Sequence, residues 1–482
     1  MTESLGCDEG LESLPLARPQ GLQLNDRLSL FSIWQIRAAL GVVLCLCTSN
    51  FAMAIETSPT LAAGRIFDLK SAIAVARENN PTLKQYRETI NQATASSDLT
   101  RTALFPVLNW NINAGPAQNS TLNVASPLFG GNSYNYYNTN LQLIQPLFVY
   151  GSFSAVDSAK FQVDINLKNV ELQERSLDSQ VIQAFYNVIY NKNLLQWRME
   201  TKPVVQKSLD VSTYRYKIGR AQLLDVLQAK TQLANLEPQI EQARAAFEAA
   251  GAQLATLLGL ENIKSISVRG KMKTLLFKDV VRRVDLKKYY LPELEQNKLQ
   301  IDQLVKARDV EMGKYWPTVK FTGTYGPTAY SQSDLWNPNA VAWSAYINVT
   351  FPLFQGFGSK YDAAVYTSQQ LQLMHVRKQL EETIFNNQTT NKTNLDSTEV
   401  SLISAVLADK LAEESLQEAI RQYRLATIDF LQFLTIQQTA LSTKSQVEQL
   451  KYASIAAYAN YFVAMGQPLN QLVDLLTEEE GK

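Results

Sequence analysis

The stretch from Trp343 to Tyr366, WSAYINVTFPLFQGFGSKYDAAVY, decides the fold. Its first part alternates, because apolar residues at 343, 345, 347, 349 and 351 are separated by Ser, Tyr, Asn and Thr. This two-residue period predicts a strand of about nine residues with one apolar and one polar face, long enough to cross a bilayer. Pro352 has no amide hydrogen to donate to a strand ladder, so it ends the strand.

A very long helix is expected directly after this strand. Between Ser359 and Gln467 there is no proline, and Gly466 is the only glycine. Apolar residues in this stretch recur at helical spacing, for example Ile403, Leu407 and Leu411. A helix from Ser359 to Tyr423 would be about 95 Å long, which no globular domain needs.

The same layout occurs twice in the chain. Pro81 and Pro106 are 25 residues apart, as are Pro292 and Pro317. The pattern predicts two structural repeats, 55–259 and 291–467, joined by a linker at 260–290 and followed by a tail at 468–482. Each repeat is expected to hold a helix, two strands, a long helix, a turn and a return helix. The strands are expected at about 107–115, 137–145, 319–326 and 343–351, and the turns (tips) at about 216–225 and 423–432.

Four strands of this kind cannot stand alone in a membrane. Every backbone donor and acceptor in hydrocarbon must be paired, so the sheet must close on itself. Four strands per chain therefore require at least two copies, since the smallest bacterial barrels have eight strands. Eight strands leave an interior filled with side chains, whereas twelve leave room for a channel. The residues expected to face lipid are Leu108, Trp110, Ile112, Leu141, Leu143, Phe321, Tyr325, Trp343, Ile347 and Val349.

Residues 1–54 are expected to be a signal peptide with an N-terminal extension. Arg37 precedes an apolar core, and Ala52-Met53-Ala54 fits the small-residue rule for cleavage. All three cysteines precede Ala54, so the mature chain would contain none. That argues against disulfides, thiolate metal sites and a cysteine nucleophile.

The composition indicates no catalysis. Lys and Arg number 45, as do Asp and Glu, so net charge favours neither nucleic acid nor an anionic surface as a partner. Neither of the two glycine-rich phosphate-binding motifs, G-x-x-x-x-G-K-S/T and G-x-G-x-x-G, occurs in the sequence. His375 is the only histidine. We expect no enzyme activity, no cofactor and no metal site.

Several short motifs, in this order and duplicated, resemble the TolC-type outer membrane efflux proteins over nearly the whole mature length. They are Asn80-Pro81, Phe105-Pro106, Pro146-Leu147-Phe148, Tyr216-Lys217-Ile218-Gly219, Asp225-Val226-Leu227 and Pro352-Leu353-Phe354. The resemblance implies an α+β membrane protein that forms a homotrimer. Four transmembrane strands per chain would build a twelve-stranded barrel, continuous with long α-helical coiled-coil hairpins that extend the tunnel across the periplasm.

The resemblance also implies the function. The protein would be the outer membrane channel of a tripartite efflux or type I secretion system in a Gram-negative-type bacterium. It would conduct substrates passively from the periplasm or from an inner-membrane pump. Its partners would be outer membrane lipid, a periplasmic adaptor (membrane fusion) protein and a pump of the RND, ABC or MFS class.

The tips carry the residues that the resemblance singles out. Candidates for adaptor contact are Tyr216, Gly219, Arg220, Tyr423, Arg424 and Ala426, and candidates for the tunnel constriction are Asp225, Asp429 and Gln432. The second tip departs from the family pattern, because Ala426 and Gln432 stand where the first tip has Gly219 and Asp225. For Asp225 and Asp429 a helix cap or a surface charge is an equally good interpretation.

Two other interpretations remain open at this point. A periplasmic coiled-coil adaptor or scaffold without membrane insertion would explain the long helices, but not four strands that alternate apolar residues with Asn and Thr. A secreted enzyme on a helical scaffold would need convergent His, Cys or paired acidic residues, which the sequence does not offer.

Overall fold

The computed structural model describes residues 66–117, 134–260, 266–283, 290–425 and 427–477. The predicted signal peptide, most of the loop after the first strand and Ala426 lie outside these residues. Everything described belongs to one compact unit that runs from Leu61 to the C-terminal end of the chain.

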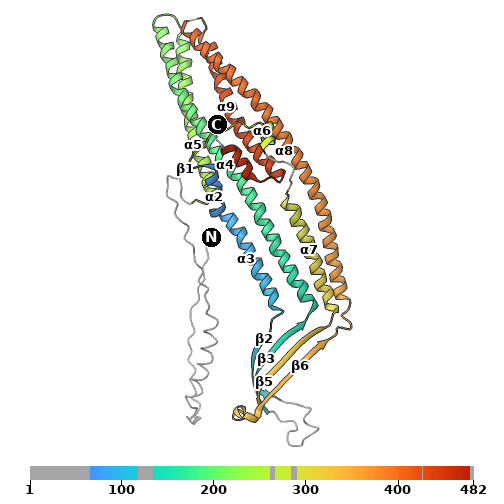
Figure 1. The fold of residues 1–482 in the computed structure, drawn as a ribbon. Coiled ribbons are helices and arrows are strands. Elements are labelled where there is room, and N and C mark those ends of the chain that lie inside the picture. Colours follow the sequence, from blue (N-terminus) through green and yellow to red (C-terminus); the bar gives the residue numbers. More distant parts are fainter. Residues whose placement is uncertain (1–65, 118–133, 261–265, 284–289, 426, 478–482) are drawn as a thin grey trace, which may run out of the picture. The chain divides into compact units, whose positions relative to one another are not determined.

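Figure 1 shows the order of the helices and strands along the chain. The first half consists of β1 (Ile66–Phe67), α2 (Leu69–Asn79), α3 (Pro81–Thr102), β2 (Val107–Ala117), β3 (Tyr134–Phe148), α4 (Tyr150–Lys217) and α5 (Leu223–Leu257). The second half consists of β4 (Ser267–Val268), α6 (Phe277–Arg283), α7 (Pro292–Met312), β5 (Thr318–Ala329), β6 (Val341–Thr350), α8 (Gly358–Leu425), α9 (Phe430–Ala464) and α10 (Leu469–Thr477).

Local sequence signals set the break between α2 and α3. The backbone amide of Asp68 donates to Ser71 Oγ (3.1 Å), which closes a capping box at the start of α2. Asn80 ends α2 and caps α3, where its Oδ1 accepts from the amide of Leu83 (3.0 Å). Pro81 then occupies the first turn of α3, where no amide hydrogen is needed.

Four strands form one antiparallel sheet in the order β2-β3-β5-β6. Sequence alternation predicted all four strands, and their observed bounds differ from the prediction by a few residues. The exception is β3, which continues through Pro146 to Phe148 instead of ending before the proline. The register shifts between Pro146 and Phe148, so an irregularity in the ladder accommodates the missing amide hydrogen.

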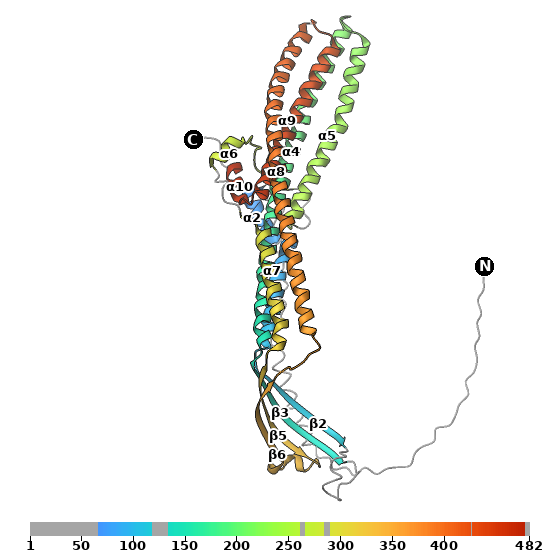
Figure 2. The ribbon, with the colours of Figure 1, turned by 90° about the vertical axis from the view of Figure 1, so that its right-hand side faces the viewer.

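Long helices continue from the strands. Both α4 and α8 have 68 residues, which corresponds to about 100 Å at 1.5 Å per residue. They turn back into α5 and α9, each of 35 residues. Figure 2 shows the sheet at one end of the helices and the two turns at the other. Shorter helices α3 and α7 lie along α4 next to the sheet.

The main hydrophobic core lies midway along the long helices. Phe185 of α4, Leu254 of α5, Tyr458 of α9 and Leu472 of α10 are among its fully buried members. Parts of the predicted linker and tail contribute to it. Strand β4 pairs in parallel with β1 (Phe67 with Val268), α6 contributes Val280, and α10 packs its apolar face against the core. The segments expected to be linker and tail therefore include ordered elements, because each carries apolar residues to bury.

None of the helices in the described part of the chain is both long and apolar enough to cross a membrane.

Candidate functional site

One face of the sheet is mainly apolar. In an antiparallel sheet, directly paired residues project to the same side, and side chains alternate along each strand. The register pairs Trp110 with Leu141, Leu141 with Tyr325, and Tyr325 with Trp343, which makes one row across all four strands. By the same rule all ten residues expected to face lipid share this face. Trp343 is 73% exposed in the single chain, and contact of this face with lipid stays a prediction.

The opposite face is polar and rich in amides. Its corresponding row pairs Asn109 with Gln142, Gln142 with Thr324, and Thr324 with Ser344. Hydrogen bonds run along this face between side chains. Asn111 Nδ2 donates to Asn140 Oδ1 (3.2 Å), Asn138 Nδ2 donates to Thr328 Oγ1 (2.8 Å), and the hydroxyls of Thr324 and Ser344 are 2.7 Å apart. The sheet is therefore built to meet a nonpolar environment on one side and a polar one on the other.

Both outer strands of this sheet have one neighbour each in the described chain. Strand β2 pairs with β3 alone, and β6 pairs with β5 alone. Each outer strand therefore presents a row of backbone amides and carbonyls that has no partner within these residues. A second chain can supply such partners.

At the hairpin tips, the two predicted constriction carboxylates cap helices. Asp225 lies in the first turn of α5, where its Oδ2 accepts from the amide of Gln222 (3.2 Å). Asp429 precedes α9, and its Oδ1 accepts from the amide of Gln432 (2.7 Å). The structure thus gives both carboxylates a capping role, and the side chain of Gln432 is exposed. Whether any of the three also lines a constriction stays a prediction.

Tyr423 does not lie where a surface contact requires it. We expected it among the adaptor-contact residues, but it is only 4% exposed. Its ring stacks on Phe433 at a centroid distance of 4.9 Å, and Phe430 packs beside it. Tyr423 therefore packs inside the second tip, and the first hairpin covers its remaining side. Of the other tip candidates, Tyr216, Gly219, Arg220 and Arg424 are exposed, and Ala426 lies outside the described residues.

Polar contacts from α4 of the first hairpin to Tyr423 of α8 join the two hairpins. The Tyr423 hydroxyl is 2.9 Å from Ser212 Oγ of α4. Arg215 Nη1 donates to the carbonyl oxygen of Tyr423 (3.2 Å), and the guanidinium lies 4.8 Å from the ring centroid. We call Ser212, Arg215 and Tyr423 the tip contact. Sequence reasoning missed Ser212 and Arg215, because each lies more than 200 positions from its partner and no local pattern marks it.

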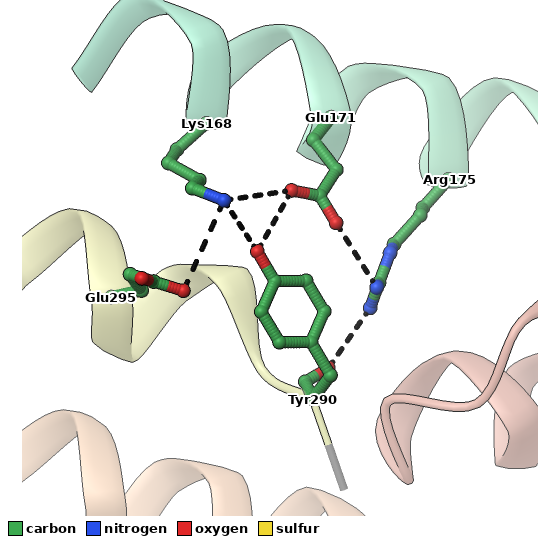
Figure 3. A network of polar contacts seen from close by, with 5 residues as sticks. All are labelled: Lys168, Glu171, Arg175, Tyr290 and Glu295. Carbon is green, nitrogen blue, oxygen red and sulfur yellow. Dashed lines mark hydrogen bonds and ion pairs between the residues drawn. The ribbon is translucent and has the colours of Figure 1, made fainter. Parts of the chain in front are cut away.

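A second polar network joins α4 to the start of α7 (Figure 3). Tyr290 OH donates to Glu171 Oε2 (3.0 Å), and Lys168 Nζ lies against the same hydroxyl and within 3.9 Å of Glu295. Arg175 bridges Glu171 Oε1 (3.2 Å) and the carbonyl oxygen of Tyr290 (3.1 Å). The hydrogen bond to Tyr290 raises the pKa of Lys168 above its ordinary value.

This network also fixes the end of α9. Gly466, which follows α9, adopts a φ of +69°, and a Cβ there would lie 2.4 Å from the carbonyl oxygen of Tyr290. Arg175 holds that same carbonyl. The first half has the same arrangement, since a Cβ on Gly259 (φ +65°) would lie 2.4 Å from the carbonyl oxygen of Asn79. Each return helix therefore ends by packing a glycine against the turn before a proline-initiated helix.

No group of three or more His, Cys, Asp or Glu side chains within the described ranges is arranged to hold a metal ion. His375 is exposed on α8.

Comparison with known proteins gives one consistent result. The sequence profile of outer membrane efflux proteins matches residues 72–260. The alkaline protease secretion protein AprF of Pseudomonas aeruginosa is 22% identical over 399 residues, which covers 80% of this chain and 81% of that protein. The outer membrane protein TolC of Salmonella enteritidis is 23% identical over 437 residues, covering 84% of this chain and 83% of TolC. The crystal structure of the Campylobacter jejuni CmeC outer membrane channel superimposes with a TM-score of 0.71 at 14% identity, covering 83% of this chain and 85% of that one.

Proposed function

We propose, on the premise that this chain is a relative of the TolC-type outer membrane efflux proteins, that it is the exit duct of a tripartite efflux or type I secretion system. It lies in the outer membrane of a Gram-negative-type bacterium and conducts substrates outward without catalysis. The observation that carries the proposal is the sheet, which has one apolar face, one amide-rich face and two outer strands that need partners.

The two outer strands favour a closed oligomer. Backbone groups in hydrocarbon cannot stay unpaired, so β6 of one copy would pair with β2 of the next until the wall closes. Three copies of the four-stranded sheet give twelve strands, which enclose a channel, whereas two copies would give a filled interior. In a homotrimer the apolar face meets lipid and the amide-rich face lines the lumen.

The helices would extend this wall into the periplasm. Both hairpins leave the sheet at the same end (Figure 2). Three copies would therefore place six hairpins side by side around one axis. The equal lengths of α4 and α8, and of α5 and α9, support two structural repeats with matched tips. The exposed tip residues Tyr216, Gly219, Arg220 and Arg424 would dock a periplasmic adaptor, which in turn recruits an inner-membrane pump. In this arrangement Asp225, Asp429 and Gln432 would surround the narrow end of the tunnel.

The tip contact would hold the tunnel narrow in the resting state. It ties the first hairpin to the second through Arg215 and Tyr423, so its loss lets the tips separate. Energy for transport would come from the pump, since the duct only has to open.

The test is the conductance of the purified mature protein in a planar lipid bilayer. We expect discrete current steps without nucleotide, and at least a twofold larger current in Arg215→Ala, because this variant loses both contacts that Arg215 makes with Tyr423. Arg220→Ala removes the same charge from the same tip, but its side chain forms no hydrogen bond or ion pair with α8 among the described residues, so its current should match that of the unaltered protein. A mature protein that stays soluble without detergent and gives no current would instead favour a periplasmic scaffold.

A further inference from the structure

Charged residues are almost absent from the sheet and its connections. No Asp, Glu, Lys or Arg occurs between Arg101 and Asp157, a stretch that contains both β2 and β3. Between Lys314 and Lys360, which encloses β5 and β6, there are two, Lys320 and Asp334. Lys320 is therefore the only charged residue within the four strands.

The register places Lys320 on the amide-rich face. It pairs with Asn348 of β6 and with Pro146 of β3, and it lies two positions from Thr322 on the same face. Its neighbours along the strand, Val319 and Phe321, project to the apolar side. A lysine that reaches for lipid headgroups would be expected on that apolar side. Lys320 points to the opposite side, so it does not serve as a lipid anchor.

The ammonium group of Lys320 is exposed and has no acidic partner among the described residues. Lys314, six positions earlier, contrasts with it because its Nζ forms an ion pair with Glu311. An unpaired charge on a polar surface acts on whatever solute passes it.

The position along the strand is also defined. Strand β5 begins at Thr318, directly after α7 and a short turn, so Lys320 lies at the end of the sheet that meets the helices (Figure 1). Asp334 lies in the connection between β5 and β6, at the opposite end. The positive charge therefore marks the transition from the helical part to the sheet, with a neutral amide surface beyond it.

We propose that Lys320 is a specificity-determining residue of the duct, and that three copies form a ring of ammonium groups at this transition that favours anionic solutes. The inference rests on the proposed function, because a ring requires the closed homotrimer. The rest of the sheet-lined passage offers amides and hydroxyls, which bind polar solutes of either sign. The ring thus sets the charge preference of this part of the passage, as rings of like side chains do in other pores.

The experiment is the reversal potential of the reconstituted channel in a salt gradient. We expect Lys320→Asn to shift it toward cation preference, with at least about a twofold change in the anion-to-cation permeability ratio at low ionic strength. The change should shrink at high salt, because counterions screen an exposed charge within a few ångströms at 1 M. An unchanged reversal potential in Lys320→Asn would overturn the proposal.

A charge swap separates the effect of charge from an effect on folding. In the double variant Lys320→Asn with Asn348→Lys, the ammonium moves to the directly paired position on the same face and at the same depth. We expect this variant to regain the reversal potential of the unaltered channel. Failure of the swap to restore it would also contradict the proposal. Absence of any current from the unaltered protein would instead count against the proposed function itself.

Discussion

At the scale of single residues, the most informative polar contact in the core is Arg77 with Asp178. The Asp178 side chain is 5% exposed and accepts from Arg77 Nε (2.9 Å), and a second contact joins Arg77 Nη2 to the other carboxylate oxygen. Burial raises the pKa of Asp178, and the guanidinium opposes that rise. The ion pair allows a charged carboxylate to lie between α2 and α4.

Replacing Arg77 by Ala should lower the free energy of unfolding by about 2–3 kcal/mol, since a buried carboxylate loses its partner. Because burial raises the pKa of Asp178, the loss should be largest at high pH and should shrink as the pH falls through that raised pKa. Thermal unfolding in detergent at several pH values, followed by circular dichroism, measures the loss of stability and its pH dependence. The control is Lys70→Ala, which removes an exposed ion pair with Asp474 and should cost about 1 kcal/mol or less. Equal effects of the two substitutions would contradict the interpretation.

Polar contacts between neighbours in the sequence follow from local signals. Asp68 and Asn80 lie at the two ends of α2, and both cap helices through partners three residues away. The Arg77–Asp178 pair and the tip contact were not predicted, since their members are 101 and more than 200 positions apart. Long-range pairs of this kind depend on the packing of helices, which a single sequence does not encode in any local pattern.

At the scale of elements, two glycines end the return helices in a conformation that a side chain would strain. For Gly466→Ala and Gly259→Ala we expect the free energy of unfolding to fall by well above about 1 kcal/mol. In both variants a positive φ is combined with a Cβ placed 2.4 Å from a carbonyl oxygen. Gly219 is the matched control, since its φ is +73° but no atom lies within 4 Å of the place that a Cβ would take. Gly219→Ala should cost about 1 kcal/mol. The melting temperatures of the three variants measure these losses. Equal shifts in all three would contradict the argument that close packing at Gly466 and Gly259 adds to the cost.

The two faces of the sheet make a second prediction at this scale. Leu141 lies near the middle of β3 on the apolar face, and its neighbour Asn140 projects to the amide-rich face. Leu141→Lys should disfavour insertion by about 2–4 kcal/mol for each copy, because a lysine near the bilayer midplane is costly. Asn140→Lys adds the same charge on the polar face and should insert normally. The yield of folded protein recovered from lipid vesicles measures both, and equal yields would mean that lipid does not cover the Leu141 face.

Element boundaries were predictable where periodicity is strong. Alternation located all four strands, and the lack of proline between Ser359 and Gln467 predicted α8 and α9. The continuation of β3 through Pro146 was not predicted, because proline usually ends a ladder. Strand β4 and helices α6 and α10 were also missed as elements, since they are short and depend on contacts with the core.

At the scale of the whole molecule, the number of strands predicted from sequence is the number observed in the sheet, but their order and register came only from the structure. The register matters most, because it shows that the apolar residues of four separate strands share one face. A slip of one residue in any strand would move its side chains to the other face. The two outer strands, β2 and β6, each have an edge without a partner in the described chain, and pairing these edges between copies would build an assembly.

The mass of the detergent-solubilised complex tests this assembly most directly. Light scattering with the detergent contribution subtracted should give three protomers for the mature protein, in a form that dissociates only on heating. A stable monomer of one protomer mass, soluble in water with Trp343 and Ile347 shielded within its own chain, would contradict the closed wall on which the duct depends.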